Sequence, residues 1–133
     1  MIIADANLII YRYLRGPLSG LADRVVRKDE DWRTSTLWRV EFASAAVKMI
    51  RGGVVGEADA IAAMTLASHE MSTRELHVPQ ARVIRIAVRH GISAYDAQYA
   101  ALAEAFGVIC VSADATFTRK APQLVVSISD FVK

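Results

Sequence analysis

Four acidic residues stand just after apolar stretches or near the start of helical stretches in this 133-residue chain. Asp5 directly follows the apolar stretch MIIA, and Asp114 comes just after the apolar stretch VICVS. Glu41 and Asp96 lie within the first two turns of stretches with helical spacing. Carboxylate oxygens are ligands with which proteins hold hard divalent cations. Metal-assisted chemistry at these residues requires that the four side chains meet in the folded protein.

Each of the four acidic residues also has a purely structural explanation. Asp5 could cap the helix that follows it, because Asp is favoured at that position. Ser93 with Asp96 resembles a capping box, and Asp114 could close an Asx turn. Glu41 could be a solvated helix residue. For each residue taken alone, the structural explanation is the better one.

The four acidic residues taken together favour a different interpretation. Carboxylates crowded at one edge raise one another's pKa, so a cluster of this kind is normally held by a cation. Oxygen ligands favour Mg²⁺ or Mn²⁺. Zinc is disfavoured, because His69, His77 and His90 show no zinc-ligand spacing with Cys110. A carboxylate-held Mg²⁺ usually meets a phosphate substrate, so the cluster predicts metal-assisted cleavage of a phosphodiester.

Strand-like and helix-like stretches alternate along the chain, which predicts an α/β fold. We expect strands at residues 1–4, 33–37, 108–112 and 124–128, and a short extended piece at 75–78. We expect helices at residues 6–14, 18–29, 37–51, 57–71, 79–91 and 93–107, and a loop or turn at 113–122. Strands separated by helices need crossover connections, so we predict three layers with a mostly parallel central sheet flanked by helices.

In a parallel sheet of this kind, every strand end and every helix start lies at one edge. Ligands bind at that edge, especially where the strand order reverses. If the strands at 1–4 and 108–112 are neighbours at this point, Asp5 and Asp114 come within a few ångströms of each other. The other two acidic residues then approach from the starts of flanking helices.

The composition predicts one globular domain, residues 1–133, located in the cytoplasm. Hydrophobic residues make up 53% of the chain, with only 7 Gly and 3 Pro, and the chain is long enough to bury a core. Cys110 is the single cysteine, so no disulfide forms within one chain. The sequence has no signal-peptide pattern and no apolar run of membrane-spanning length.

The aromatic residues are expected to contribute mainly to the core. Tyr95, Tyr99 and Phe106 stand at helical spacing and are expected to be buried. Trp32 and Trp38 flank the second predicted strand, where core and interface positions are both open.

Nearly the whole chain resembles the PIN-domain ribonucleases of the VapC-type toxin group. The resemblance rests on MIIADANLII at the start, RVEFASA in the middle, then SAYDAQYAALAEAFG and VICVSADATF. The last two motifs, in this order and spacing, are the most specific. The resemblance implies the PIN fold and a hydrolase that cuts RNA as the toxin of a toxin–antitoxin pair.

The resemblance also implies roles for individual residues. Four positions match the acidic quartet that binds one or two divalent ions, namely Asp5, Glu41, Asp96 and Asp114. Asn7 matches a polar position that orients a water or a ligand carboxylate. Some members carry a further acidic or amide residue where this chain has Thr116, a departure that affects the second metal.

For the reaction and the partners, the resemblance implies attack by metal-activated water on an RNA phosphodiester, leaving 5′-phosphate and 3′-hydroxyl ends. It implies a homodimer and a small antitoxin protein that blocks the acidic groove. Among the basic residues, Arg12, Arg15, Arg119 and Lys120 are expected nearest the acidic edge and are the better candidates for holding RNA. The basic residues at 82, 85 and 89 are better explained as a solvated helix face.

Two other functions remain open from the sequence. A receiver-like signalling domain also gathers acidic residues and Mg²⁺ at strand ends, but it needs a lysine after a late strand, and Lys120 follows Asp114 too closely. A catalytically silent binding module would keep the fold for protein contacts, and the full acidic quartet argues against it.

Overall fold

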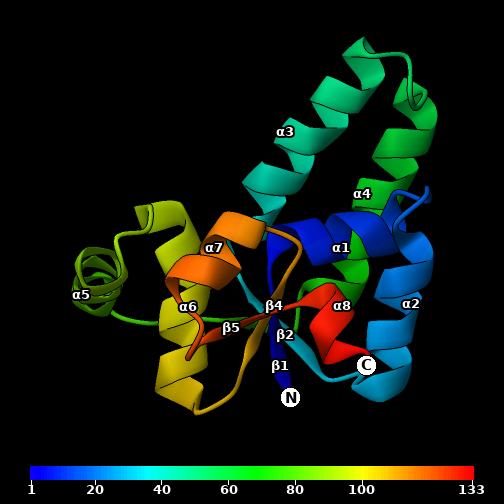
Figure 1. The fold of residues 1–133 in the computed structure, drawn as a ribbon. Coiled ribbons are helices and arrows are strands. Elements are labelled where there is room, and N and C mark those ends of the chain that lie inside the picture. Colours follow the sequence, from blue (N-terminus) through cyan, green and yellow to red (C-terminus); the bar gives the residue numbers. More distant parts are fainter.

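The computed structural model describes residues 1–133 as a five-stranded sheet with helices around it (Figure 1). The strands are β1 (Ile2–Ala4), β2 (Trp32–Ser35), β3 (Glu75–Leu76), β4 (Cys110–Ser112) and β5 (Val125–Ser127). They are ordered β3-β2-β1-β4-β5, and every neighbouring pair is parallel. The predicted α/β class and the predicted parallel sheet are confirmed.

Eight helices connect and flank the strands. They are α1 (Ala6–Tyr13), α2 (Ser19–Lys28), α3 (Trp38–Arg51), α4 (Glu57–Met71), α5 (Gln80–His90), α6 (Ala94–Phe106), α7 (Ala115–Lys120) and α8 (Ile128–Phe131). Helix α6 packs against β1 and β2, whereas α1 packs against β1 and β4 from the other side of the sheet. Helices α3 and α4 form a hairpin that extends beyond the sheet (Figure 1).

The strand order reverses at β1. The chain proceeds from β1 to β2 and β3 on one side, and then returns to place β4 on the other side of β1. The register pairs Ile3 with Cys110 and Ala4 with Val111, and the Asp5 N–H donates to the Val111 carbonyl at 3.1 Å. The carboxyl ends of β1 and β4 are therefore adjacent, which meets the condition under which Asp5 and Asp114 were expected to approach each other.

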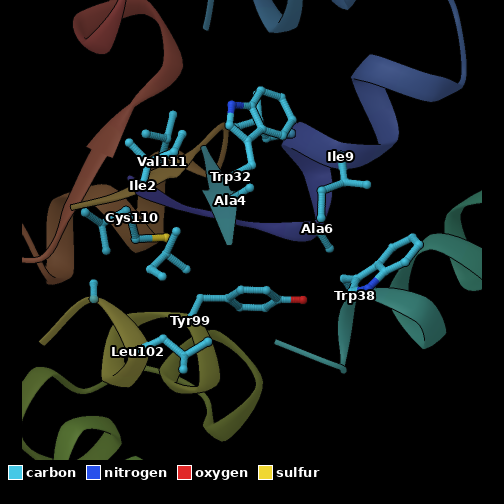
Figure 2. Packing of buried hydrophobic residues seen from close by; sticks show 14 of the residues in the cluster. Ile2, Ala4, Ala6, Ile9, Trp32, Trp38, Tyr99, Leu102, Cys110 and Val111 are labelled. Carbon is cyan, nitrogen blue, oxygen red and sulfur yellow. The ribbon is translucent and has the colours of Figure 1, made fainter. Parts of the chain in front are cut away.

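The core is a continuous cluster of buried apolar side chains from all layers (Figure 2). Trp32 and Trp38 are both 0% exposed, so the two tryptophans belong to the core. Their indole N–H groups donate to the Asp29 carbonyl and the Glu75 carboxylate, each at 2.9 Å. Buried indoles keep their hydrogen bonds in this way, and no buried side-chain nitrogen or oxygen lacks a hydrogen-bond partner.

The predicted burial of the three aromatic residues on α6 is wrong for two of them. Tyr99 is fully buried, but Tyr95 and Phe106 are 67% and 43% exposed. The buried face of α6 is built mainly from small residues, because α6 lies close against the sheet and offers space for few large side chains. Its buried residues are Ala97, Tyr99, Ala100, Ala101, Leu102 and Ala103.

Two short helices replace segments that were predicted differently. The segment 113–122 contains α7, in which the Asp114 side chain accepts from the Phe117 N–H and Phe117 is buried. The chain after β5 continues into α8, which Ser127 caps. Helix α3 begins at Trp38, so Glu41 lies in its first turn.

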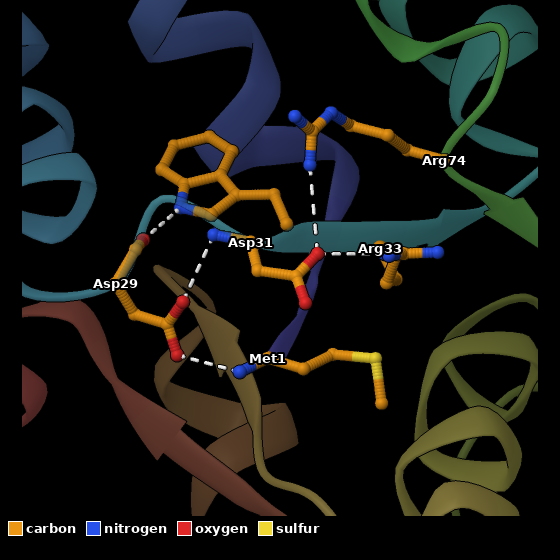
Figure 3. Close-up of polar contacts among 6 residues, drawn as sticks. Met1, Asp29, Asp31, Arg33 and Arg74 are labelled. Atoms are coloured by element: carbon orange, nitrogen blue, oxygen red, sulfur yellow. Dashed lines mark hydrogen bonds and ion pairs between the residues drawn. The ribbon is translucent and has the colours of Figure 1, made fainter.

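A chain of polar contacts joins the starts of β1 and β2 at the opposite edge of the sheet (Figure 3). The N-terminal ammonium of Met1 contacts Asp29 at 2.8 Å, and Asp29 accepts from the Asp31 N–H at 2.9 Å. Asp31 then pairs with Arg33 at 2.7 Å and with Arg74 at 3.5 Å. These groups are partly exposed, so each pair contributes at most about 1 kcal/mol. None of the helices is both long and apolar enough to serve as a membrane span.

Candidate active site

A cavity of about 310 Å³ opens at the carboxyl edge of the sheet, where the strand order reverses. All five residues predicted for the site line this cavity, together with five others. The lining residues are Asp5, Ala6, Asn7, Ile10, Glu41, Ser44, Ala45, Lys48, Asp96 and Asp114. The fold therefore brings together side chains from the ends of two strands and the starts of α1, α3 and α6.

Asp5 is the most buried acidic residue of the cavity, with 4% of its surface exposed. One carboxylate oxygen accepts from the Ala6 N–H at 2.7 Å, and the other accepts from the Ser112 hydroxyl at 2.6 Å and the Asn7 amide at 3.1 Å. Burial raises the pKa of Asp5 to about 7, although the Ser112 hydrogen bond opposes this, and the charge of Glu41 raises the pKa further. The orientation of this carboxylate is thus fixed by three donors.

Ser112 was missed by the sequence analysis. Its fully buried hydroxyl donates to Asp5 and accepts from the Asn7 amide at 3.2 Å and the Asp114 N–H at 3.0 Å. Asn7 completes the connection, because its amide oxygen accepts from the Ala113 N–H at 3.0 Å. These bonds hold the ends of β1 and β4 together beneath the cavity. A hydroxyl at the end of the otherwise apolar stretch VICVS was the available signal.

Glu41 is held by a residue that the sequence predicted only as core. The Tyr99 hydroxyl donates to the Glu41 carboxylate at 3.1 Å, and its ring lies among core side chains with the hydroxyl directed toward the start of α3 (Figure 2). Burial raises the pKa of Tyr99, and the nearby Glu41 charge raises it further, so the hydroxyl keeps its proton. Burial and the charge of Asp96 raise the pKa of Glu41.

Asp96 and Asp114 stand on the other side of the cavity. The Asp96 side chain accepts no hydrogen bond, while its N–H donates to the Ser93 hydroxyl at 3.0 Å. Burial raises the pKa of Asp96, and the charge of Asp114 adds to this. Asp114 caps α7 with one oxygen, which accepts from the Phe117 N–H at 3.1 Å. Asp5 caps α1, as its structural explanation allowed, and Asp114 caps α7 where an Asx turn was considered, so both capping roles coexist with positions in the cavity.

The negative charge of the cavity is not balanced by ion pairs. Nine salt bridges form in the protein, and none includes any of the four acidic residues. Lys48 is the single basic residue that lines the cavity. An oxygen-rich, negatively charged donor set of this kind suits a hard divalent cation.

The carboxylates stand apart from one another within the cavity. No group of three or more acidic, histidine or cysteine side chains is arranged closely enough to hold a metal ion directly. Mg²⁺ binds commonly through one or two carboxylates and keeps several waters, so the donor set fits that ion with the remaining carboxylates acting through water. Thr116, at the position where relatives of the resembled family carry a further ligand, does not line the cavity.

The basic residues that the sequence placed near the acidic edge do not line the cavity. Arg12 lies over the Trp32 ring, 5.0 Å from its centroid, and Arg15 binds Asp23 through two hydrogen bonds. Lys120 donates to the Gly91 carbonyl at 3.2 Å. On α5, the two arginines at 82 and 89 both pair with one glutamate of α6, residue 104. Most of the predicted RNA-holding groups thus have partners within the protein.

Comparison with known proteins identifies the family whose sequence pattern this chain matches. Residues 2–122 match the PIN domain family. Ribonuclease VapC3 from Pyrobaculum aerophilum is 29% identical over 128 residues, which cover 93% of this chain and 97% of that protein.

Solved structures share the fold along almost the entire chain. PAE2754 from Pyrobaculum aerophilum superposes with a TM-score of 0.77 at 23% identity, covering 98% of this chain and 92% of that one. FitAcB from Neisseria gonorrhoeae superposes with a TM-score of 0.67 at 20% identity, covering 97% and 99%. FitAB bound to the IR36 DNA fragment gives 0.68 at 20% identity, covering 96% and 95%. At these identities the likeness establishes a common fold.

Proposed function

The chain belongs to the PIN-domain family, and on that basis we propose that it is a Mg²⁺- or Mn²⁺-dependent endoribonuclease, the toxin of a type II toxin–antitoxin system. The relative Ribonuclease VapC3 supports the substrate class. The observation that carries the proposal is a cavity lined by four carboxylates, none of which has a cationic partner in the protein. Such a cavity repels a phosphodiester until a cation enters it.

Asp5, Glu41, Asp96 and Asp114 would hold the divalent ion, directly or through its waters. When bound, the ion supplies Lewis acidity, which makes water a better nucleophile and offsets the negative charge on the phosphoryl group. The expected reaction is hydrolysis of an RNA phosphodiester that leaves 5′-phosphate and 3′-hydroxyl ends.

The protein's own residues keep the carboxylates in fixed orientations. Ser112 and Asn7 fix Asp5, and the Tyr99 hydroxyl fixes Glu41. The proposed role of Asn7 is to orient a ligand carboxylate, which agrees with the hydrogen bond that its side-chain amide donates to Asp5. Preorganised groups need no rearrangement when charge develops in the reaction, which is a major source of catalysis.

The test is cleavage of a mixed RNA pool with Mg²⁺ or Mn²⁺, with and without a chelator. Wild-type protein is expected to cleave only with the metal, and Asp96→Asn is expected to abolish cleavage. The control is Asp59→Asn, because Asp59 is also an acidic residue in the first turn of a helix but lies outside the cavity. Cleavage that survives the chelator, or equal cleavage by Asp96→Asn, contradicts the proposed mechanism.

The proposed partners are an RNA substrate, a cognate antitoxin and a second copy of the chain, all in the cytoplasm. Light scattering on the purified protein tests the homodimer, and a molar mass of one chain contradicts it. Inhibition of RNA cleavage by the product of a small neighbouring gene tests the antitoxin.

A further inference from the structure

Lys48 places a positive charge in the wall of the acidic cavity. It follows Glu41 by seven residues on α3, so both side chains lie on the same face of the helix, with Ser44 and Ala45 between them. All four of these residues line the cavity. The face of α3 that meets the cavity therefore carries a carboxylate at its start and an ammonium group near its end.

The Lys48 ammonium group has no partner in the protein. It takes part in none of the nine salt bridges, and it donates no hydrogen bond to a side chain or a carbonyl. In contrast, Arg39 on the same helix pairs with Glu75 at 2.8 Å. An ammonium group that neutralised the acidic residues would form an ion pair with one of them, so neutralisation does not explain Lys48.

The spacing along α3 separates Lys48 from the carboxylates. Seven residues correspond to about 10 Å of helix rise. This displacement runs along α3 toward the turn that connects it to α4 (Figure 1). A phosphate held by a cation at the carboxylates would lie near the start of α3, where Glu41 stands. A lysine displaced along the helix is then positioned for a different phosphate of the same strand.

We propose that Lys48 is a positioning residue that binds the backbone phosphate next to the cleaved one and so aligns RNA across the cavity. This inference rests on the proposed ribonuclease function. A phosphate contact carries no base information, so Lys48 sets the position of the strand and not the sequence that is cut. The acidic residues act on the cleaved phosphate, and Lys48 acts on its neighbour.

The test compares Lys48→Gln with wild type on two substrates: a single-stranded RNA oligonucleotide, and a dinucleotide whose only phosphate is the cleaved one. On the oligonucleotide, Lys48→Gln is expected to raise KM about tenfold, as for loss of one charged hydrogen bond, with kcat unchanged. On the dinucleotide, kcat/KM should not change. The logarithm of affinity should depend on the logarithm of salt concentration with a slope shallower by about 0.7, as for one lost phosphate contact on a single strand.

Two variants serve as controls. Lys48→Arg keeps the positive charge and should retain the wild-type KM. Arg27→Gln removes a positive charge from α2, which does not line the cavity, and should leave both KM and the salt slope unchanged. Lys48 is exposed, so Lys48→Gln should unfold at the wild-type temperature, which circular dichroism checks.

The results separate this inference from the proposed function. Wild-type protein that cleaves neither substrate overturns the ribonuclease proposal and this inference with it. Wild-type cleavage with an unchanged KM in Lys48→Gln overturns only the role of Lys48. Equal losses on both substrates with a changed Mn²⁺ affinity would show that Lys48 acts on the carboxylates instead.

Discussion

At the scale of single residues, the acidic side chains of the cavity differ in how firmly they are held. The Asp5 carboxylate accepts from three donors, whereas the Asp96 carboxylate accepts from none. An amide in place of Asp5 would turn a donor toward Ser112 and Asn7, so Asp5→Asn disturbs the site as well as removing a charge. Asp96→Asn removes only a charge.

We predict that Asp96→Asn raises the thermal stability of the metal-free protein at neutral pH while abolishing cleavage. The reason is that burial and the charge of Asp114 raise the pKa of Asp96, so the charged carboxylate is unfavourable in the folded state. Thermal unfolding with a chelator present measures the effect. A lower unfolding temperature than wild type would show that Asp96 is not repelled by its neighbours.

Ser112→Ala should destabilise the protein by about 1–3 kcal/mol, because the variant leaves buried polar partners with fewer hydrogen bonds. The lost bonds are those to Asp5, Asn7 and the Asp114 N–H. Mn²⁺ affinity should also fall, since the Ser112 hydrogen bond favours the charged form of Asp5. Urea unfolding and metal titration measure the two effects. The exposed Ser129 provides the control, and Ser129→Ala should change stability by less than about 0.5 kcal/mol.

At the scale of elements, helix starts position the acidic side chains. Asp5 caps α1, Ser93 caps α6, and Asp114 caps α7. A cap uses one oxygen of a carboxylate to bind a helix N–H; the second oxygen accepts from Ser112 and Asn7 in Asp5 and has no donor in Asp114. Capping is therefore a way of aiming a carboxylate, and the structural and chemical explanations of these residues are compatible.

The two roles of Asp114 can be separated by two substitutions. Asn is as good a cap as Asp, so Asp114→Asn should keep the stability of α7 and the fold while losing RNA cleavage. Asp114→Ala should lose both, with a stability cost of about 1 kcal/mol. Chemical unfolding and the RNA assay give the two readouts. Equal stability of the two variants would show that the bond from the Phe117 N–H to Asp114 contributes nothing to folding.

The elements that the sequence predicted well are those with strong periodicity or clear end signals. The helix at Glu57–Met71 was predicted at its observed bounds, and Gly91 and Gly107 end their helices in the left-handed conformation that glycine favours. Helix α7 was not predicted, because a six-residue segment is too short to show a period. Its single buried side chain, Phe117, is held by tertiary contacts, which the local sequence pattern does not reveal.

The candidate site was predictable in part for a similar reason. The acidic residues follow strand ends and helix starts, which the chain order places at one edge of the sheet, whereas Asn7 was assigned through the family resemblance. The places of Lys48 and Ser112 in the site were not predicted from the sequence. For Lys48 the place depends on which face of α3 meets the cavity, and for Ser112 it depends on a hydroxyl that bonds across two strands. The burial of Tyr99 was predictable from spacing, but the hydrogen bond of its hydroxyl to Glu41 required the packing of α6 against the sheet and beside α3.

At the scale of the whole molecule, charge is distributed unevenly. The net charge is +2, yet the carboxyl edge of the sheet holds a group of acidic residues without ion pairs. Elsewhere, most acidic residues pair with arginine or lysine at the surface, where pairs contribute little to stability. The electrostatic cost of folding is therefore concentrated at the cavity.

This concentration predicts how stability depends on pH. The pKa of Asp5 is raised from 3.8 to about 7, and those of Glu41 and Asp96 are raised as well. Between about pH 4 and 7 the folded protein thus binds more protons than the unfolded chain, and its free energy of unfolding falls as pH rises. For Asp5 alone the slope approaches about 1.4 kcal/mol per pH unit within this window. The metal-free protein should be less stable at pH 8 than at pH 5.

A divalent cation should reverse this trend, because it binds the charged carboxylates that destabilise the metal-free fold. Mn²⁺ is expected to raise the unfolding temperature strongly at pH 8 and weakly at pH 5, where protons compete for the same oxygens. Calorimetry at both pH values, with NaCl of equal ionic strength in place of MnCl₂ as the control, measures the difference. Asp96→Asn should reduce the Mn²⁺ effect, whereas Asp59→Asn, outside the cavity, should retain it. Equal stabilisation by Mn²⁺ and by NaCl would mean that the charge at this edge is screened in general and that no cation is held by the four carboxylates.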